Sequence, residues 1–474
     1  MRTQISKLGE YKKEERTIKG WIDVARHQGK MAFFDFRDAT GKVQGVVFGK
    51  PEVLEVAKTL RAQWVVEITG IVNERPDKMK NQDVLNGDIE LEITHIKVLN
   101  EAVTPAFELD KDTRQIGEEV RLAHRYLDLR TPRMQNNIRM RSQIIRSIRE
   151  YFYTYDFNEI ETPILTKSTP EGARDYLVPS RLYPGNAYAL PQSPQQYKQL
   201  LMGSGFERYF QVARCMRDED LRGDRQPEFT QMDLEMAFTT EEEVMEINER
   251  LLVKLVETLY PEKRIQEIPF PRISYQEAME KYASDRPDIR TDREDPNLLA
   301  FCWIVDFPAF ERTDKSDDPQ AQGEWTFTHN PFSLPKEEHI NDLMNKENIE
   351  NIIASQYDIV LNGYEIGGGS IRCHNADVQR AILQLLGHDE EAIDTNFGHM
   401  LAMLESGCPP HGGIAWGLDR LVMLLQGEPN IREVIAFPKT REGRDPMMGS
   451  PSTVSKGQWD ELGLTLKEKR EKNK

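Results

Sequence analysis

The sequence predicts an α+β protein in which a small N-terminal β-barrel of the OB type precedes a larger domain built on an antiparallel sheet with flanking helices. Two patterns predict this fold. Residues 17–99 hold five short runs of alternating apolar and polar residues with turn residues between them. Beyond residue 138, helical segments mix with pairs of strands joined by tight turns. The 474 residues are also too many for one ordinary core, which favours two or three domains.

The composition is typical of a soluble globular protein, with 38% hydrophobic and 30% charged residues. No apolar run approaches the roughly 18 residues needed to cross a bilayer, so we expect no membrane partner. The N-terminal residues lack the apolar segment of a signal peptide. The four cysteines are scattered without a CxxC pair, which predicts reduced thiols in a cytoplasm and argues against a zinc site or a disulfide framework.

The net charge of −17 taken alone argues against a nucleic-acid partner, but the charge is unevenly distributed. Residues 1–104 carry 17 basic and 16 acidic side chains, a net charge of +1, and the remainder carries −18. Residues 121–149 contain eight arginines and one aspartate. Because a binding footprint is local, this basic segment leaves a polyanionic partner open.

The predicted barrel has five strands and a short helix after the third strand. The expected strands are 17–26, 31–38, 43–49, 64–72 and 89–99, and the expected helix is 51–62. The turn sequences ATGK and LNGD separate strands. Barrels of this type frequently bind oligonucleotides, but the pattern is equally typical of a barrel with a purely structural role.

A linker and a long helix follow the barrel. We divide the chain into a barrel domain at 1–104, a linker or hinge at 105–137 and a larger domain at 138–474. Within 138–155, isoleucines and a phenylalanine recur at helical spacing, which predicts the first helix of the larger domain.

The charged segment at residues 214–235 joins two predicted strands. Period-two alternation places Arg217 and Glu219 on one face of the first strand and places Asp233 and Glu235 on one face of the second. The strands would then present an arginine and several carboxylates to one surface. An arginine fork suits phosphate, and a carboxylate suits an amine. A surface salt-bridge ladder is the competing interpretation.

Residues 357–372 (YDIVLNGYEIGGGSIR) predict a hairpin with a two-residue turn at the NG pair. This turn pairs Val360 with Glu365, so that Asp358 and Glu365 project from the same face. Two carboxylates this close in an enzyme interior need a divalent cation or an amine between them. The three glycines that follow allow a ligand to approach the backbone closely, although a glycine-rich bulge is the alternative.

Residues 409–425 (PPHGGIAWGLDRLVMLL) predict an extended segment of small residues that leads into an amphipathic helix near Asp419 and Arg420. An arginine in the first turn of a helix opposes the helix dipole unless an anion lies there. This segment alone is weak support for a site. Together with the two segments above it indicates an anion-binding site.

These segments resemble the three signature motifs of the class II aminoacyl-tRNA synthetases. The segment around Pro163 after the long helix resembles motif 1, MRDE with its return strand resembles motif 2, and GLDR resembles motif 3. Within that class, TPEGARDY, LPQSPQQYKQLLM, GYEIGGGSIR and PPHGGIAWGLDRLVMLL resemble the aspartyl-tRNA synthetases of the bacterial type. The resemblance extends to VIAFPKTREGRDPMMGSPS near the C-terminus and so covers nearly the whole chain.

The resemblance implies a two-step ligase reaction. The α-carboxylate of L-aspartate attacks the α-phosphate of ATP, which gives aspartyl-adenylate and pyrophosphate. The terminal ribose hydroxyl of tRNA(Asp) then accepts the aspartyl group. The resemblance further implies Mg²⁺, a homodimer and a cytoplasmic location. Whether tRNA(Asn) is a second acceptor is left open, because the preference of the loop near Gln28 cannot be read from the sequence.

For ATP, the resemblance implies that Arg217 holds the α-phosphate and that Arg420 holds the γ-phosphate. Phe229 would stack on adenine. Glu219 joins Arg217 and Arg420 as the expected catalytic residues, and Asp358 and Glu365 match the acids that hold magnesium. The expected ATP-binding residues are Arg217, Asp218, Glu219, Gln226, Phe229, Glu365, Gly417, Leu418, Asp419 and Arg420.

For aspartate, Lys198 and Arg372 match the two cations that grip the side-chain carboxylate. Asparagine would leave these cations partly unpaired in a dry pocket, which allows strong discrimination. His329 begins HNPF where the family usually has HHPF, so the role of Asn330 is left open. The expected aspartate-binding residues are Glu171, Gln195, Lys198, Arg217, Asp233, His329 and Arg372.

In the barrel, Phe33 and Gln44 match residues that stack on and read the anticodon, with Arg26 nearby. Stacking on an exposed aromatic ring is a common way for OB folds to hold splayed bases. Core packing is the competing interpretation for Phe33, because only some of the three phenylalanines in MAFFDF can face outward.

The sequence departs from the family in two places. Bacterial-type members usually carry a large inserted domain after the segment SDRPDIR, whereas only residues 291–297 separate Arg290 from Leu298 here. We expect a short turn at this point and an intact site, because no matched site residue belongs to the insertion. Asp156 also stands where motif 1 often has glycine.

Three other functions compete with this interpretation. QSPQQYKQ and GSIR argue against a relative that activates asparagine or lysine. A non-catalytic paralogue that only binds tRNA or an amino acid would not need the complete set of ATP and metal residues. An amide-forming ligase that does not use tRNA would lack the barrel.

Overall fold

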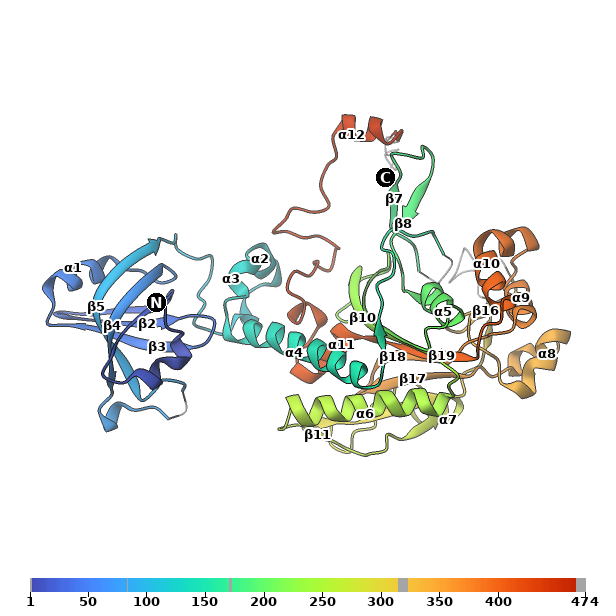
Figure 1. Ribbon diagram of the computed structural model, residues 1–474, viewed down its shortest axis with the longest axis horizontal. Coiled ribbons are helices and arrows are strands. Elements are labelled where there is room, and N and C mark those ends of the chain that lie inside the picture. The colour runs from blue at the N-terminus through green and yellow to red at the C-terminus, as the bar shows by residue number, and fades with distance from the viewer. Residues whose placement is uncertain (1, 83, 170–172, 314–322, 466–474) are drawn as a thin grey trace, which may run out of the picture. The chain divides into compact units, whose positions relative to one another are not determined.

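The computed structural model describes residues 2–82, 84–169, 173–313 and 323–465 (Figure 1). The chain forms two compact units, Met1–Gln135 and Asn136–Lys474. Each unit has a hydrophobic core of its own.

The first unit contains a closed β-barrel with the strand order β1-β2-β3-β5-β4, which confirms the predicted OB-type barrel. The helix α1 (Pro51–Thr59) follows the third strand as expected, and a short helix η1 (Ile5–Tyr11) precedes the first. The strands are β1 (Glu15–Gln28), β2 (Met31–Arg37), β3 (Lys42–Phe48), β4 (Val65–Glu74) and β5 (Ile89–Asn100).

The alternation along β2 sends successive side chains to opposite sides of the barrel wall. Phe34 and Phe36 are buried in the barrel core, with their ring centroids 5.7 Å apart. Phe33, which precedes Phe34 and so points to the other side of the wall, is only partly buried and lies outside that core. The interpretation of Phe33 as a core residue is therefore wrong.

Short helices follow the barrel within the first unit. They are η3 (Thr113–Gln115), α2 (Glu118–Ala123) and α3 (Arg125–Asp128). The fully buried carboxylate of Asp128 accepts hydrogen bonds from Thr113 at 2.7 Å, Arg125 at 2.6 Å and Arg121 at 3.3 Å. A buried carboxylate is stable only with such partners, so Asp128 ties the three helices together.

The second unit is built on an eight-stranded sheet with the order β12-β14-β17-β18-β19-β10-β9-β6. Neighbouring strands are antiparallel except at the two edges, where β12 pairs in parallel with β14 and β6 with β9. This confirms the predicted antiparallel sheet. The strands are β6 (Asn158–Glu159), β9 (Arg208–Met216), β10 (Glu228–Ala237), β12 (Arg272–Ser274), β14 (Phe301–Val305), β17 (Gln356–Leu361), β18 (Tyr364–Ile371) and β19 (His411–Gly417).

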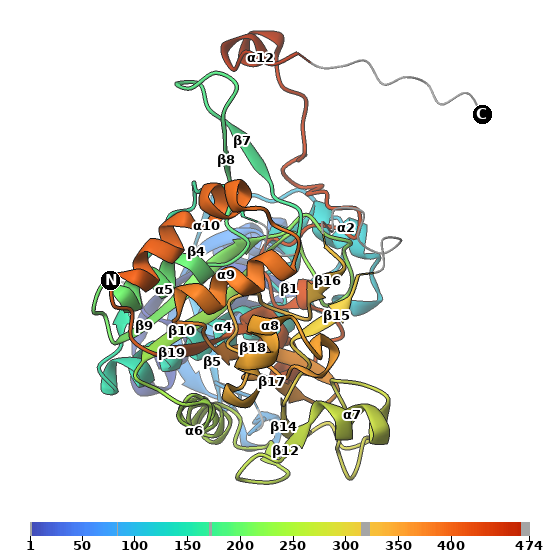
Figure 2. The ribbon, with the colours of Figure 1, turned by 90° about the vertical axis from the view of Figure 1, so that its right-hand side faces the viewer.

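The main hydrophobic core lies on one face of this sheet, where α6 (Glu241–Leu259) runs along the strands (Figures 1 and 2). Residues of α4 (Pro132–Thr154) and α11 (Leu418–Gln426) belong to the same core. Leu234 and Ile359 point into this core, so their neighbours Asp233 and Asp358 face the other side of the sheet. The strand alternation thus separates the core from a polar face.

Helix α4 begins at Pro132, earlier than the predicted residue 138, and proline is well suited to the first turn of a helix. The chain leaves the helix through Asp156, whose φ of +59° lies in the left-handed region. This conformation favours glycine, and aspartate is one of the few other residues that tolerate it. The glycine often found here in motif 1 therefore has a conformational explanation.

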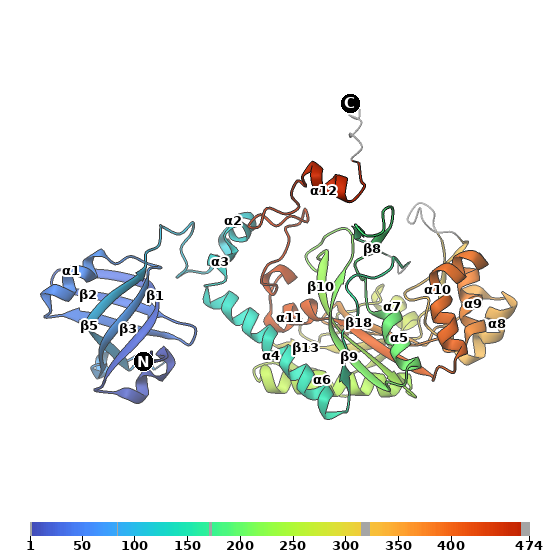
Figure 3. The same ribbon diagram turned by 45° about the horizontal axis from the view of Figure 1, so that its top comes forward.

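Smaller elements complete the second unit. The helices α9 (Ala376–Leu385) and α10 (Glu390–Glu405) lie side by side (Figure 3). Residues of both helices form a hydrophobic cluster with Phe332. The remaining elements are β7 (Leu177–Pro179), β8 (Ala187–Ala189), α5 (Gln195–Gly203), β11 (Arg264–Ile265), α7 (Tyr275–Tyr282), β13 (Leu298–Leu299), β15 (Phe310–Arg312), β16 (Trp325–Phe327), α8 (Ile340–Asn345) and α12 (Lys456–Glu461). None of the helices in the described part of the chain is both long enough and apolar enough to span a membrane.

Residues 291–297 form the short connection expected where the family insertion is missing. Gln266 Oε1 accepts a hydrogen bond from the backbone N–H of Thr291 at 2.8 Å, and Arg264 pairs with Asp295 at 2.5 Å. The parallel pairing of β11 with β13 closes the connection. The second unit therefore closes over this point with a hydrogen-bonded turn.

Candidate active site

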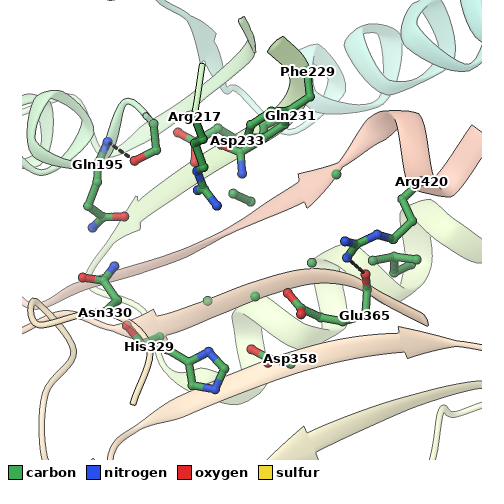
Figure 4. A pocket seen from close by; sticks show the side chains of 18 of the residues that line it. Gln195, Arg217, Phe229, Gln231, Asp233, His329, Asn330, Asp358, Glu365 and Arg420 are labelled. Carbon is green, nitrogen blue, oxygen red and sulfur yellow. Dashed lines mark hydrogen bonds between the residues drawn. The ribbon is translucent and has the colours of Figure 1, made fainter. Parts of the chain in front are cut away.

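A cavity of about 360 Å³ opens on the polar face of the sheet (Figure 4). Its walls come from β10, β17, β18 and β19 and from the N-terminal ends of α5 and α11. Most of the predicted site residues line it, namely Gln195, Lys198, Arg217, Glu219, Gln226, Phe229, Asp233, His329, Asp358, Glu365, Arg372, Gly417, Asp419 and Arg420.

Three predicted residues are not placed in the cavity wall. Glu171 lies outside the described residues. The side chain of Asp218 is 49% exposed and lies 3.8 Å from Arg174, and Leu418 is buried in the main hydrophobic core. The side chains of Asp218 and Leu418 are therefore not positioned in the cavity.

Arg217 follows the end of β9 and points into the cavity beside Phe229 of β10 (Figure 4). Its guanidinium carbon lies 5.2 Å from the centre of the Phe229 ring, and its Nε donates to Gln192 O at 3.4 Å. Among the described residues, no carboxylate lies within ion-pair distance of Arg217. An arginine in this state is well suited to bind an anionic ligand.

The loop between β9 and β10 carries Glu219 and Gln226. Glu219 lies 3.9 Å from Arg225 of the same loop. Both polar atoms of the Gln226 amide are bonded to the backbone of Lys439, because Oε1 accepts from its N–H at 2.7 Å and Nε2 donates to its carbonyl at 3.2 Å. Gln226 therefore fixes the end of the loop against a distant segment.

Arg420 lies in the first turn of α11 and reaches across the cavity to β18 (Figure 4). It donates to the carbonyl oxygen of Glu365, and its Nη2 lies 3.1 Å from Asp224 Oδ2. An arginine in the first turn of a helix needs a nearby anion to offset the helix dipole. In this structure the anion is the Asp224 carboxylate.

Asp419 serves as a structural anchor at the start of α11. Its carboxylate accepts from the backbone N–H of Thr230 at 2.8 Å and pairs with Arg141 at 2.5 Å. The residue is 3% exposed. These bonds connect α4, β10 and α11, and so they support the position of the adjacent Arg420.

The β17–β18 hairpin has the predicted register. Val360 pairs with Glu365, and both turn residues have positive φ, +50° at Asn362 and +86° at Gly363. A bulge beside Val360 then shifts the pairing so that Asp358 lies opposite Gly368. Asp358 and Glu365 both face the cavity, as predicted.

Asp358 and Glu365 border one small space. Burial raises the pKa of Asp358 well above its usual range, and the neighbouring Glu365 adds to the rise. A Cβ at Gly368 would lie 2.7 Å from Asp358 Oδ1 and 3.8 Å from Glu365 Oε1, so only glycine leaves this space open. Within the described ranges, no group of three or more His, Cys, Asp or Glu side chains could hold a metal alone. Two such carboxylates fit a Mg²⁺ ion that takes its other ligands from phosphate and water.

His329 and Asn330 form the wall opposite Arg217 (Figure 4). Burial lowers the pKa of His329 despite the nearby Glu365, so its imidazole is neutral near pH 7. Asn330 Oδ1 accepts from the backbone N–H of Phe332 at 3.0 Å, which is a local turn of the Asx type. Asn330 therefore shapes the loop that carries His329.

Two buried cations, Lys198 and Arg372, contact two buried carboxylates. Lys198 Nζ lies 2.6 Å from Asp233 Oδ1 and 3.2 Å from Glu235 Oε2. Arg372 donates to Glu235 Oε1 from Nε at 2.8 Å and to Glu235 Oε2 from Nη2 at 3.2 Å. Burial opposes the charge of both acids and raises the pKa of Asp233, but Arg372 and Lys198 outweigh it at Glu235 and lower that pKa to about 2.

Gln195 begins α5 beside these charges. Its backbone N–H donates to Ser193 Oγ at 3.2 Å (Figure 4). Its Nε2 donates to Gln199 Oε1 at 3.1 Å. The side-chain carbonyl of Gln195 remains available to accept a hydrogen bond from a ligand. The cavity therefore combines free acceptors, paired cations and an arginine without a carboxylate partner.

The predicted barrel residues lie together on the outer wall of the first unit. Arg26 stands opposite Phe33 in the pairing of β1 with β2, and Gln44 stands opposite Asp35 in the pairing of β2 with β3. Arg26 and Asp35 are 3.5 Å apart. An aromatic ring with amide and guanidinium groups beside it is typical of a single-stranded nucleic-acid surface.

Two contacts of charged residues in the cavity could not be predicted from the sequence. Strand alternation placed Glu235 on the face of Asp233, but nothing in the sequence indicates its contact with Arg372, 137 residues away. Asp224 lies in a loop with many charges, and its partner Arg420 is 196 residues away. Long-range pairs of this kind leave no local pattern.

Two family models match the chain. Residues 117–441 match the tRNA synthetases class II (D, K and N), and residues 17–99 match the OB-fold nucleic acid binding domain.

Curated relatives match nearly the whole chain. The aspartate–tRNA(Asp/Asn) ligase of Rubrobacter xylanophilus is 40% identical, with 95% of this chain and 94% of the relative covered. The aspartate–tRNA ligase of Staphylococcus carnosus is 37% identical, with 95% and 96% covered. These alignments span 574 and 578 residues, so each relative contains a stretch that has no counterpart among the 474 residues here.

The fold is also that of a solved asparaginyl-tRNA synthetase. The Pyrococcus horikoshii structure, complexed with asparaginyl-adenylate, matches with a TM-score of 0.71 and 23% identity over 91% of this chain and 96% of that one. At this identity the likeness concerns the fold alone. Because proteins named for different amino acids share this fold, the side chains in the cavity must decide the substrate.

Proposed function

The chain belongs to the class II tRNA synthetases of the D, K and N group, and on that premise we propose that it attaches L-aspartate to tRNA at the expense of ATP. Aspartate and ATP would react to aspartyl-adenylate and pyrophosphate. The adenylate would then transfer its aspartyl group to the terminal ribose hydroxyl of the tRNA.

One observation carries the choice of aspartate. The cavity holds two buried cations, Lys198 and Arg372, a short distance from an arginine suited to phosphate, Arg217. A side-chain carboxylate satisfies buried cations, whereas the neutral amide of asparagine leaves them partly unpaired. We assign Lys198 and Arg372 to the side-chain carboxylate of the substrate.

The ammonium group of the substrate would lie near Asp233 and Gln195. Asp233 Oδ2 is buried and has no hydrogen-bond partner among the described residues, so it is ready to accept from a ligand. Glu171 belongs to the same proposed set. His329, neutral near pH 7, would donate or accept one hydrogen bond at the substrate without adding charge.

The ATP site is proposed on the opposite wall. Arg217 would hold the α-phosphate and neutralise the charge that develops during attack, which is where electrostatic stabilisation has its largest effect. Phe229 would stack on adenine with the face away from Arg217. Glu219, Gln226 and Arg420 would orient the nucleotide, with Arg420 exchanging Asp224 for the γ-phosphate.

Magnesium is proposed to accompany ATP. The donor set fits, because Asp358 is a buried carboxylate with a raised pKa beside Glu365, and such a pair requires a cation when both groups are ionised. When bound, the ion would neutralise the phosphate charge. Asp358 and Glu365 would hold the ion, and the absence of a side chain at Gly368 leaves space for it.

The barrel is proposed to bind the anticodon through Arg26, Phe33 and Gln44. Support comes from the outward position of Phe33 and from the match of residues 17–99 to a nucleic-acid binding domain. The acceptor is tRNA(Asp). One relative is named for both tRNA(Asp) and tRNA(Asn), so tRNA(Asn) is the second acceptor to test.

We further propose a homodimer in the cytoplasm. The dimer is supported by apolar side chains left exposed in the second unit, Tyr153 of α4 at 54% and Phe437 at 52%, which border one depression. The cytoplasm is supported by the four free cysteines, three of which are buried.

The test is ATP–pyrophosphate exchange with purified protein and Mg²⁺, with aspartate, asparagine and lysine compared. We expect exchange with aspartate alone. Charging of tRNA(Asp) and tRNA(Asn) transcripts then shows which acceptors are used. A folded protein that binds tRNA but supports no exchange with any of the three amino acids would overturn the ligase proposal in favour of a non-catalytic paralogue.

A further inference from the structure

Glu235 is a fully buried carboxylate in the second unit. It lies on β10 with an exposed fraction of 0%, and both of its oxygens contact cations. Oε1 accepts from Arg372 Nε at 2.8 Å, and Oε2 lies 3.2 Å from both Arg372 Nη2 and Lys198 Nζ. One carboxylate thus bridges the two cations that we assign to the substrate side chain.

The contacts of Glu235 leave one donor on each cation. An ammonium group has three N–H donors, and within the described part of the chain Lys198 uses two of them, on Asp233 and Glu235. A guanidinium has five, and Arg372 uses four, on Glu235 twice, on Ser370 Oγ at 2.8 Å and on Gly413 O at 3.3 Å. Two N–H groups therefore remain, one from Lys198 and one from Nη1 of Arg372.

The residues packed against Glu235 leave room for its carboxylate between the two cations. Gly413 of β19 lies against it, and a Cβ at this position would overlap with Glu235 Oε2 and with the carbonyl of Leu234. The hydroxyl group of Tyr357 donates a hydrogen bond to Gly413 O at 3.1 Å. The absence of a side chain at position 413 therefore allows the bridge.

Each buried cation of this group contacts a carboxylate in the structure. Lys198 and Arg372 carry two positive charges, and Asp233 and Glu235 supply two carboxylates. Arg372 and Lys198 hold the pKa of Glu235 at about 2, so it remains ionised at neutral pH. Both cations therefore have a carboxylate partner before a substrate binds, and their remaining N–H donors set the direction from which a substrate carboxylate can approach.

We propose that Glu235 is a positioning residue that turns Lys198 and Arg372 into a two-donor clamp for the side-chain carboxylate of the amino-acid substrate. A carboxylate has an acceptor oxygen for each free donor. An asparagine amide offers one acceptor oxygen, and its NH₂ group would face the other donor. The clamp rests on the proposed aspartate substrate, and it assigns part of the discrimination against asparagine to a residue that does not touch the substrate.

The test substitutes Glu235→Gln and Glu235→Asp and measures binding of L-aspartate and L-asparagine to the full-length protein by calorimetry, without ATP. Glutamine keeps the length but presents an NH₂ group to one of the cations. In Glu235→Gln, we expect the affinity for aspartate to fall at least tenfold. The ratio of the affinity for aspartate to the affinity for asparagine should fall at least fivefold. Glu235→Asp keeps the charge but reaches only one cation, so we expect an intermediate loss.

Glu249→Gln is the matched control. Glu249 is also a buried glutamate, 8% exposed, and it lies in α6, outside the cavity wall. Its carboxylate accepts a hydrogen bond from the backbone N–H of Phe270 at 3.1 Å. A purely structural role for Glu235 would make both Gln variants lose thermal stability with unchanged aspartate affinity. In ATP–pyrophosphate exchange, we expect Glu235→Gln to raise KM for aspartate and leave KM for ATP within twofold.

The outcomes separate the clamp from the ligase proposal. Unchanged aspartate affinity and unchanged selectivity in Glu235→Gln would overturn the clamp. If that variant does not fold, wild-type selectivity in Glu235→Asp would overturn it. Aspartate binding that depends on Glu235, without pyrophosphate exchange, would support the clamp and overturn the ligase proposal. No aspartate binding by the unmodified protein would overturn both.

Discussion

The two units place their functional side chains in opposite settings. In the barrel, Phe33 lies on the outer wall while Phe34 beside it forms the core. In the second unit, the residues proposed to grip the substrate, Lys198 and Arg372, are themselves buried, with 2% and 3% of their side chains exposed. Removing one partner of a buried ion pair leaves an uncompensated charge. Function and stability are therefore separable in the barrel and coupled at Lys198 and Arg372.

Arg217 should behave differently from Lys198 and Arg372, because it lies in the cavity without a carboxylate partner among the described residues. We expect Arg217→Ala to lower the rate of aspartate-dependent pyrophosphate exchange on the order of 10³-fold, since it removes the main electrostatic stabilisation at the α-phosphate. The thermal midpoint should remain that of the unmodified protein. A loss of less than tenfold would remove Arg217 from the proposed catalytic set.

Phe34→Ala should lower the stability of the barrel and leave amino-acid activation unchanged, the opposite of Arg217→Ala. The Phe34 ring is 1% exposed, and truncation of a buried phenylalanine costs about 3–5 kcal/mol of unfolding free energy. We expect this loss in urea unfolding of the first unit, whereas pyrophosphate exchange, which requires only the second unit, should persist in native buffer. Equal damage to exchange would show that the units do not function separately.

Phe33→Ala should have the complementary effect. A base stacked on an aromatic ring contributes about 1–3 kcal/mol, so KM for tRNA in aminoacylation should rise by roughly 5- to 150-fold. Unfolding free energy and pyrophosphate exchange should change little, because the ring lies outside the barrel core. An unchanged KM for tRNA would contradict the proposed stacking of a base on Phe33.

The smallest expected effect concerns acid stability of the barrel. Burial alone would raise the pKa of Asp23, but Arg37 at 2.8 Å and Lys42 at 2.5 Å outweigh burial and lower it. A lowered folded-state pKa gives stability that is present above the unfolded value of about 3.9 and is lost as the pH falls through the folded value. Asp23→Asn should therefore reduce the thermal midpoint at pH 6, and the difference from the unmodified protein should shrink towards pH 3. A difference independent of pH would contradict this account.

Local patterns in the sequence were sufficient for several elements. The five barrel strands follow from period-two alternation between turn residues, and the register of the β17–β18 hairpin follows from the Asn362-Gly363 turn, which requires positive φ at both residues. Alternation also separated Asp233 and Asp358 from their core-facing neighbours. These features depend on interactions between residues that are close in the chain, which is why a sequence displays them.

Resemblance to a family supplied what local patterns do not contain, namely the amino acid, the nucleotide and a role for each site residue. The resemblance was less informative at positions where this chain departs from the family pattern. Asn330 in place of the second histidine has a defined role only once its Asx turn is seen. Asp156 in place of glycine is explained by its φ of +59°.

The two-part architecture, the polar face of the sheet and most of the residues that line the cavity could be predicted from the amino-acid sequence alone. Which charged side chains contact one another could be seen only in the folded protein. Glu235 reaches Arg372 over 137 residues, Arg420 reaches Asp224 over 196, and Gln226 reaches Lys439 over 213. Such contacts depend on the packing of whole strands and helices against one another. No periodicity in the chain encodes them, although they hold Arg372, Arg420 and Gln226 in place.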